Sequence, residues 1–257
     1  MQKPTMAIQL YTLRDYTQTA KDFDATLARL SKLGVQDVQI SAVGDIPADV
    51  QRDILQKNDM RVCVTHKSFD WMLSAPLDAV EHHRTIGCDA IGIGAAPGEA
   101  RGSIAAVRDF IEKAQQIGKV FRENGMRFHY HNHSFEFDPL DNSDTCMMDL
   151  LLEETDPDLF HFIPDVAWLH YAGKDPVEYL QKMRGRIKVV HFKDYVLDAE
   201  GKHHFVSLGQ GLVDLKACYD AVCELGIPYI AYEQDCDWTD GDPFKSVDES
   251  WAFLQSL

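Results

Sequence analysis

The 257-residue sequence lacks three features that define large classes of protein. It has no apolar run near the ~20 residues that a membrane-spanning helix needs. Its six cysteines form no Cys-x-x-Cys pair and no regular framework, as is typical of free thiols in a reducing compartment. Its 25 Lys and Arg residues are outnumbered by 41 Asp and Glu residues, giving a net charge of −16. With no basic run, nucleic acid is not an expected partner, because phosphate backbones are held by clustered cations.

The beginning of the chain, Met1 to Leu10, contains no apolar stretch as long as that of a signal peptide. We therefore expect a cytoplasmic protein, with a periplasmic one as the alternative if a signal peptide has been removed. The composition, 45% hydrophobic and 26% charged, is that of an ordinary globular protein. The length suits either two average domains or one (β/α)8 barrel, so the internal pattern decides between them.

Short apolar runs rich in β-branched residues alternate with longer amphipathic segments along the whole chain. Eight runs are typical of strands: residues 6–11, 35–40, 60–66, 90–95, 126–133, 160–165, 187–192 and 228–233. The segments between them repeat apolar residues at helical spacing, as Val107, Phe110 and Ala114 do. Most of these segments end at a residue that tolerates a left-handed conformation: Gly34, Asn58, Gly87, Gly125, Gly185 and Gly226.

Eight strand-then-helix units, the last helix covering residues 243–257, are the number that closes a parallel barrel. An open doubly wound sheet is the competing arrangement. No linker, low-complexity segment or change of composition interrupts the pattern. We therefore expect residues 1–257 to form one α/β domain, a single (β/α)8 TIM barrel. In such a barrel the functional side chains lie at the carboxyl ends of the strands and in the adjoining loops.

Four neighbouring strands, the fifth to the eighth, are predicted to end in imidazole or carboxylate groups. The side chains at these ends are His131, His133, Asp165, His191 and Glu233. A single such group is usually a hydrogen-bonded loop residue, but four adjacent strands indicate a metal or acid/base site, because burying these groups unpaired is unfavourable. Mixed imidazole and carboxylate ligands suit Mn²⁺, Zn²⁺, Co²⁺ or Fe²⁺ better than Ca²⁺, which binds oxygen atoms.

The fifth strand offers several candidates. Alternation places His129, His131 and His133 on one face. We choose His131 as a metal ligand and His133 as an outer residue or substrate contact, with a purely structural, hydrogen-bonded role as the alternative. Glu136 has two interpretations: it reaches back into the site if the chain bends after His133, or it is a solvated loop acid.

Several segments spread over nearly the whole chain form a specific combination. They are residues 9–14 (QLYTLR), 130–137 (YHNHSFEF), 165–168 (DVAW), 172–176 (AGKDP), 186–194 (RIKVVHFKD), 209–214 (GQGLVD) and 232–233 (YE). Together they resemble the xylose isomerase-like TIM barrels, the sugar phosphate isomerase/epimerase superfamily that also contains inosose dehydratases, tagatose epimerases and endonuclease IV. The sequence is similar to the branch with a His-Asn-His fifth strand.

The resemblance implies one divalent ion, Mn, Zn, Co or Mg, held at the ends of strands five to eight. The usual ligands of the family are Glu, Asp, His and Glu. Asp165, His191 and Glu233 match the last three, whereas His131 stands in place of the first Glu. In the isomerases and epimerases both glutamates act as acid/base groups on opposite faces of the substrate, whereas this sequence retains only the second of them, Glu233. Trp168 stands where the epimerase-type members often have a catalytic His.

Other side chains near the expected site are candidates for the substrate. Lys193 follows a predicted ligand and could stabilise a developing enolate, with a salt bridge to Asp194 or Glu233 as the alternative. Four side chains are candidate substrate contacts: His66, His133, Trp168 and Arg14. Trp168 would stack on a sugar face, unless it only packs against other aromatic rings.

Three further patterns are not expected to carry a function. Gly92-Ile-Gly94 lacks the third glycine of a dinucleotide-binding motif, because Pro97 occupies that place. The acidic loop 235–241 resembles a calcium loop, but Ser246 stands where a bidentate Glu is needed. The pairs His82-His83 and His203-His204 lack ligand spacing and are expected at the surface.

The sequence thus predicts a metal-dependent isomerase or epimerase of a sugar, sugar phosphate or keto-sugar. It would remove a proton next to a carbonyl through an enediolate, with Glu233, His131 and Lys193 as catalytic residues. The alternatives are a metal-dependent dehydratase or β-eliminating lyase acting on a keto-sugar or inosose, an inactive carbohydrate-binding barrel, and an abasic-site endonuclease, which the acidic charge opposes. The expected partner is a small sugar, with neither nucleic acid nor membrane, and a homo-oligomer is left open.

Overall fold

The computed structural model describes residues 3–257, so Met1 and Gln2 of the amino-terminal stretch lie outside the described residues. Eight parallel strands form one sheet in the order β6-β5-β4-β3-β2-β1-β10-β7. The strands are β1 (Thr5–Gln9), β2 (Asp37–Ile40), β3 (Arg61–His66), β4 (Ala90–Ile93), β5 (Arg127–His131), β6 (Phe160–Ile163), β7 (Val189–Phe192) and β10 (Tyr229–Tyr232). Each coincides with one of the eight predicted runs.

The sheet closes on itself between β6 and β7. Two isolated parallel bridges join these strand segments, one between Phe162 and Ile187 and the other between Asp165 and His191. The predicted single (β/α)8 barrel is therefore confirmed, and the chain does not form the open doubly wound sheet. The second bridge also brings two predicted metal ligands side by side.

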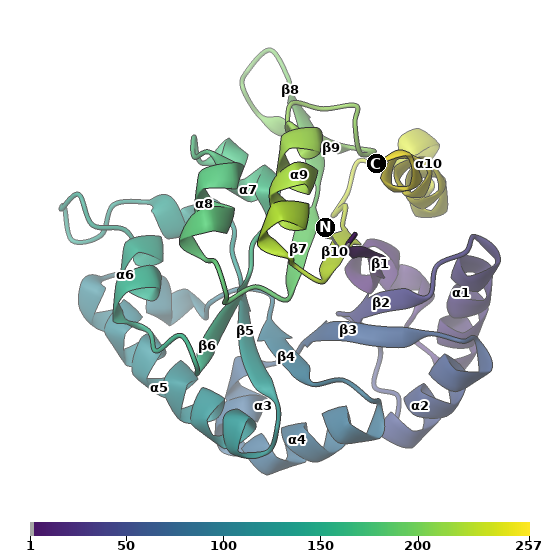
Figure 1. Ribbon diagram of the computed structural model, residues 1–257, viewed down its shortest axis with the longest axis horizontal. Helices are drawn as coiled ribbons and strands as arrows, with labels where there is room; N and C mark the ends of the chain where they lie inside the picture. The colour runs from purple at the N-terminus through teal and green to yellow at the C-terminus, as the bar shows by residue number, and fades with distance from the viewer. Residues whose placement is uncertain (1–2) are drawn as a thin grey trace.

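Helices surround the strands (Figure 1). They are α1 (Ala20–Lys32), α2 (Ala48–Lys57), α3 (Phe69–Ser74), α4 (Pro76–Thr85), α5 (Ile104–Glu123), α6 (Met147–Glu154), α7 (Val166–Tyr171), α8 (Pro176–Lys182), α9 (Leu215–Leu225) and α10 (Pro243–Ser256). Short 3-10 helices cover η1 (Leu10–Tyr16), η2 (Gly98–Arg101), η3 (Phe135–Phe137) and η4 (Thr239–Gly241). The apolar stripe of α5 packs on the outside of the barrel, where the rings of Phe110 and Tyr130 lie 5.8 Å apart. Because successive side chains of a strand point to opposite faces, every second strand residue points into the barrel instead.

The residues predicted to take a left-handed conformation after the helices do so with one exception. Five glycines, Gly34, Gly87, Gly125, Gly185 and Gly226, have φ between 66° and 91°, as the left-handed conformation requires. Asn58 does not: its φ is −100°, and the next residue, Asp59, takes the left-handed conformation at φ 54°. Asn58 Nδ2 instead donates a hydrogen bond to Asp24 Oδ1 at 2.9 Å, which ties α2 to α1.

An antiparallel hairpin of β8 (Asp194–Leu197) and β9 (His203–Val206) was not predicted. It projects beyond the ring of helices at the top of Figure 1. Asp194 holds the returning chain, because its Oδ2 accepts backbone N–H groups from Gly209 at 3.0 Å and Gly211 at 2.9 Å. A Cβ atom at Gly211 would lie 2.2 Å from Asp194 Oδ1, so only glycine fits. Asp194 is therefore committed to the hairpin, and the predicted alternative of a Lys193–Asp194 salt bridge is not formed.

The surface prediction for His83 is wrong. Its side chain is fully buried under α4, with Nε2 2.7 Å from Thr65 Oγ1 and Nδ1 2.6 Å from the carbonyl oxygen of Ala79. Burial lowers the pKa of His83 to about 3. The ring is thus a neutral, hydrogen-bonded link between α4 and β3.

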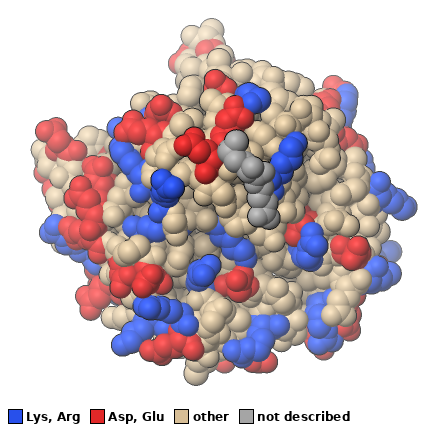
Figure 2. Space-filling view, in the orientation of Figure 1, with Lys and Arg blue, Asp and Glu red and all other residues tan. Residues whose placement is uncertain are grey.

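Acidic and basic side chains alternate over the face seen in Figure 2, which shows no continuous basic band.

Among residues 3–257, no helix combines the length and the apolar character needed to cross a membrane.

Candidate metal centre and active site

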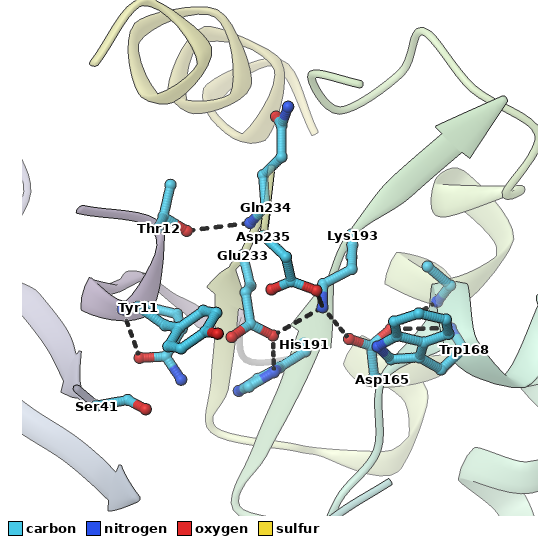
Figure 3. A network of polar contacts seen from close by, with 12 residues as sticks. Tyr11, Thr12, Ser41, Asp165, Trp168, His191, Lys193, Glu233, Gln234 and Asp235 are labelled. Atoms are coloured by element: carbon cyan, nitrogen blue, oxygen red, sulfur yellow. Dashed lines mark hydrogen bonds and ion pairs between the residues drawn. The ribbon is translucent and has the colours of Figure 1, made fainter. Parts of the chain in front are cut away.

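Four predicted ligands converge at the carboxyl ends of β5, β6, β7 and β10. They are His131, Asp165, His191 and Glu233, and one potential ligand atom of each lies within 4.8 Å of the others. All four side chains are buried. His191 Nδ1 lies 2.9 Å from Glu233 Oε2, and Figure 3 shows Asp165 on the other side of the Lys193 ammonium. The barrel thus assembles a mixed imidazole and carboxylate set from four separate strands.

One of these groups lacks the partner that burial normally demands. Within the described residues, His131 Nδ1 has no hydrogen-bond partner, whereas Asp165 Oδ2 faces the Lys193 ammonium at 3.3 Å. Leaving such an atom unsatisfied is unfavourable by about 1–3 kcal/mol. Imidazole nitrogen and carboxylate oxygen are suitable ligands for a divalent transition ion. The residues present therefore fit the expected metal.

Lys193 fills the space beside this set (Figure 3). Its Nζ lies 2.8 Å from Asp235 Oδ2, 3.0 Å from Glu233 Oε2 and 3.3 Å from Asp165 Oδ2. The side chain is 1% exposed. Three carboxylates around one ammonium leave an excess of two negative charges, which is the charge that one divalent cation neutralises.

The charged groups in this cluster shift one another's pKa values. Burial alone would lower the pKa of Lys193, but Asp165, Asp235 and Glu233 outweigh it and hold that pKa well above its ordinary value. Burial also opposes ionisation of Glu233, yet Lys193 and His191 keep the pKa of this carboxyl well below its ordinary value. Lys193 is therefore a charged donor, and Glu233 is an ionised ligand at neutral pH.

A side-chain relay extends from His191 across the barrel to β3. His191 Nε2 lies 2.7 Å from Gln39 Oε1, and Gln39 Nε2 lies 2.9 Å from His66 Nε2. Burial, with a smaller contribution from neighbouring His191, lowers the pKa of His66 to about 3, so the ring is neutral. Gly94 makes room for that ring, because a Cβ atom there would lie 3.0 Å from His66 Nδ1. Gln39 thus fixes the orientation of a predicted ligand, as outer-sphere partners of metal-binding histidines do.

Glu136 fits neither of its two predicted alternatives. It is fully buried, and its carboxylate accepts hydrogen bonds from Tyr130 Oη at 2.6 Å and from the His133 backbone N–H at 2.8 Å. Burial raises the pKa of Glu136 to about 7. Asn132 Oδ1 completes the corner by accepting the backbone N–H of Asp165 at 3.1 Å. The acid therefore shapes the chain after β5 rather than entering the cavity or meeting solvent.

His133 is placed by this corner. Its ring stacks on Phe135 with centroids 5.6 Å apart and lies 5.4 Å from the Trp168 ring. Its buried Nδ1 has no hydrogen-bond partner among residues 3–257. Burial, with a smaller contribution from Lys193, lowers the pKa of His133 to about 4. The ring is therefore neutral, so one of its two nitrogens carries no proton.

Trp168 and Arg14 border the site without lining its cavity. The Trp168 ring packs among His133, His203 and Phe205, with Lys193 Nζ 5.3 Å from its centroid. Arg14 Nη1 donates to the backbone oxygen of Tyr11 at 2.9 Å, and Nη2 donates to that of Asp235 at 3.0 Å. Arg14 thus ties η1 to the loop after β10.

A cavity of about 370 Å³ opens above the ligands. Besides Lys193 and Glu233, its walls include Tyr11, Ser41, His66, His131, His133 and Asp235. Its size lies within the range of about 300–1,000 Å³ that is usual for small-molecule sites. Five of the predicted site residues, His66, His131, His133, Lys193 and Glu233, therefore share one cavity.

A sequence profile of the xylose isomerase-like TIM barrel matches residues 27–257. The chain belongs to this family. Inosose dehydratase from Lacticaseibacillus casei is 30% identical over 157 residues, which is 55% of this chain and 51% of that protein. The match thus spans about half the length of that relative.

Solved structures agree on the fold of this xylose isomerase-like barrel. A sugar phosphate isomerase/epimerase from Parabacteroides distasonis has a TM-score of 0.85 at 22% identity, over 100% of this chain and 95% of that one. A xylose isomerase-like TIM barrel protein from Mycobacterium smegmatis, in complex with magnesium, has a TM-score of 0.72 at 15% identity, over 100% and 98% of the two chains.

The site of this xylose isomerase-like barrel also contains side chains that the sequence analysis did not select. Asp235 lies two residues after Glu233, and strand alternation could have placed it on the same side. Gln39 and Ser41 carry no ionisable group, and their distance in sequence from β7 hid their contact with the site.

Proposed function

We propose that this barrel is a divalent-metal-dependent lyase acting on a neutral keto-sugar or keto-cyclitol. The observation that carries the proposal is the buried ligand set of β5, β6, β7 and β10 beside the Lys193 ammonium. The reaction removes the proton next to the ketone and expels a β-oxygen substituent as water or an alcohol. Two facts favour elimination over isomerisation: His131 replaces the first Glu of the resembling isomerases, and the curated relative is an inosose dehydratase.

The side chains divide the work between them. The His133 imidazole is the proton acceptor, because His133 lines the cavity and its ring is neutral. Proton removal leaves the C–H electron pair in an enolate; when the enolate carbonyl re-forms, a carbon–carbon double bond forms, the bond to the β-oxygen breaks, and that oxygen leaves with a proton. Lys193, charged and facing the same space, stabilises the enolate oxygen and supplies that proton.

The predicted catalytic residues Glu233 and His131 take a different place in this proposal. Glu233 is already engaged by Lys193 and His191, and one potential ligand nitrogen of His131 lies within 4.8 Å of the ligand atoms of Asp165, His191 and Glu233. We assign both to holding the metal. When bound, the ion polarises the substrate carbonyl and so acidifies the neighbouring C–H bond.

The charged side chains around the cavity favour a neutral substrate over a sugar phosphate. In the part of the chain that the structure describes, Lys193 is the only Lys or Arg side chain that lines the cavity. The Lys193 ammonium is surrounded by three carboxylates, and the Arg14 guanidinium already donates hydrogen bonds to backbone oxygens. A phosphate dianion would find no unpaired cation there. The proposed partner is thus a small polyhydroxylated ketone, with residues 1–257 acting as one domain and with no role for nucleic acid or membrane.

Isomerisation or epimerisation is the second candidate. It is favoured by the position of His133 after β5 and Glu233 after β10, two strands that are not neighbours in the barrel. Groups on opposite walls could remove and return a proton on opposite faces of one carbon. Its first step is the same proton removal as in elimination, so the two reactions differ only after the enolate has formed.

Proton NMR in D₂O, with inososes and keto-hexoses as substrates and Mn²⁺, Zn²⁺, Co²⁺ or Mg²⁺ added, separates these reactions. We expect an unsaturated product, with water or alcohol released, and activity that disappears on chelation. A product that keeps every oxygen and gains deuterium beside the carbonyl would identify an isomerase or epimerase instead. Sugar binding without turnover under any metal would identify the inactive binding barrel. As a further check, His133→Asn should lose about 10²–10⁴-fold in kcat while metal content is unchanged.

A further inference from the structure

A second cavity, of about 410 Å³, lies at the opposite end of the barrel, where the strands begin. Its walls include Arg127, the first residue of β5, Lys188, which precedes β7, and His161 near the start of β6. None of its lining residues belongs to the cavity at the carboxyl ends of the strands. Its volume also falls within the range of about 300–1,000 Å³ for small-molecule sites.

The charged side chains of this cavity have a positive excess. Lys188 pairs with Asp89, and Arg122 pairs with Asp158 at 3.4 Å. Arg127 takes part in none of the ion pairs found among residues 3–257. In a chain with a net charge of −16, an uncompensated guanidinium beside a cavity is a local exception that favours an anion.

The inner wall of the cavity contains a buried polar group without a partner. His129 is fully buried, and in the described chain neither its Nδ1 nor its Nε2 has a hydrogen-bond partner. His161 Nδ1 also lacks one, and the two rings lie 5.2 Å apart. An unsatisfied buried polar group is unfavourable by about 1–3 kcal/mol, so these rings are suited to meet a ligand that enters the cavity.

We propose that this cavity binds a phosphate group, either as inorganic phosphate or as part of a small phosphorylated metabolite. The Arg127 guanidinium offers paired N–H donors that match two phosphate oxygens, and Lys188 adds a compact charge. The imidazoles of His129 and His161 supply further donors. Burial, with a smaller contribution from Arg127, lowers the pKa of His161 to about 4, as expected where the surrounding potential repels a cation.

The two ends of the barrel form separate sites. His129 and His131 lie two residues apart on the same face of β5, about 7 Å along the strand. The phosphate site is thus stacked below the metal centre, and it does not depend on the function proposed for that centre. The competing explanation is that Arg122 and Arg127 only offset the negative carboxyl end of α5.

Isothermal titration of the metal-loaded protein with inorganic phosphate tests the proposal, and sn-glycerol 3-phosphate provides the second arm. We expect saturable binding of about one phosphate per chain, weakened about tenfold or more in Arg127→Met and in Lys188→Met. Arg127 is exposed, so its replacement should leave the fold intact. Arg184→Met, which changes an exposed arginine outside this cavity, is the matched control and should bind as the wild type does.

Each outcome bears on the proposal. Tighter binding of the ester than of phosphate would support a phosphorylated metabolite, and equal binding would support the free ion. Binding that survives unchanged in Arg127→Met and Lys188→Met would place the anion elsewhere, such as at the metal, and would overturn the proposal. No binding up to about 10 mM would leave only the helix-end role for the arginines.

Discussion

Lys193 Nζ lies 3.0 Å from Glu233 Oε2, the same carboxylate oxygen that is 2.9 Å from His191 Nδ1. One oxygen atom thus links the ammonium that we assign to catalysis with an imidazole that we assign to the metal. A change in the charge of Glu233 will therefore change the electrostatic environment of both Lys193 and His191. The same contact makes the site a source of instability when one partner is removed.

Replacing Lys193 should expose that dependence. Lys193→Met leaves two buried carboxylates, Asp165 and Glu233, and the partly exposed Asp235 without a counter-charge. We expect the free energy of unfolding of the metal-free protein to fall by about 3–5 kcal/mol. Urea denaturation followed by circular dichroism measures the change, and an added divalent ion should restore part of it. Lys216→Met, which breaks an exposed pair with Asp220, is the control and should shift stability little. An equally stable Lys193→Met protein would show that the carboxylates are not held together by this ammonium.

The barrel and its ligand set could be predicted because both depend on local patterns. The spacing of apolar residues identified each of the eight strands. Functional sites of parallel barrels lie at the carboxyl ends of the strands, and this selected Asp165, His191 and Glu233. The predicted ligand His131 joins them in the structure. Their roles in binding and catalysis stay predictions.

The features that escaped prediction depend on contacts between distant segments. Gln39 meets His191 only because β2 and β7 face each other across the closed barrel, which no local pattern reveals. Glu136 turns inward because Tyr130 and the His133 backbone offer it donors. His83 could have been identified: it lies four residues after buried Ala79 and so shares its helix face.

Metal binding should depend on the four converging side chains. We expect about one divalent ion per chain, lost on chelation, and a large drop in affinity for Asp165→Asn and His131→Ala. Gln39→Ala removes only the partner of His191 and should weaken binding by about 10–100-fold. Elemental analysis and calorimetric titration measure both effects. An exposed carboxylate variant, Glu200→Gln, should bind metal normally, and equal affinity in all four variants would contradict the assignment.

Glu136 should make stability fall as pH rises toward neutrality. Its pKa is 4.5 in the unfolded chain and is raised to about 7 by burial, so the folded state binds the extra proton between these values. Stability attributable to this group is therefore present below pH 4.5 and lost as pH rises through 7, by about 3 kcal/mol in total. Glu136→Gln cannot ionise, so its stability relative to the wild type should improve by up to that amount between pH 5 and pH 8.

Chemical denaturation at the two pH values measures this difference. Glu136→Gln also loses an acceptor for the Tyr130 hydroxyl or the His133 N–H, at a cost of about 1–3 kcal/mol at either pH. The change between the two pH values, rather than the absolute stability, is therefore the test. Tyr130→Phe keeps the acid and should retain the wild-type direction of the pH dependence. A Glu136→Gln profile parallel to that of the wild type would mean that the acid titrates normally.

His83 should have the opposite effect: it should make the free energy of unfolding fall as the pH falls below 6.5. Its pKa is 6.5 in the unfolded chain and is lowered to about 3 by burial, so below pH 6.5 the unfolded state binds more protons. The stability of the neutral ring is complete above pH 6.5 and is lost as pH falls toward 3, by about 3 kcal/mol between pH 6.5 and pH 4.5. His83→Gln has no proton to gain, so its unfolding free energy should decline less over that interval. His204→Gln, which replaces a half-exposed ring on the hairpin, should decline as the wild type does. Denaturant midpoints measured at half-unit steps of pH give the slopes, and equal slopes for the wild type and His83→Gln would show that His83 is not held neutral between Thr65 and Ala79.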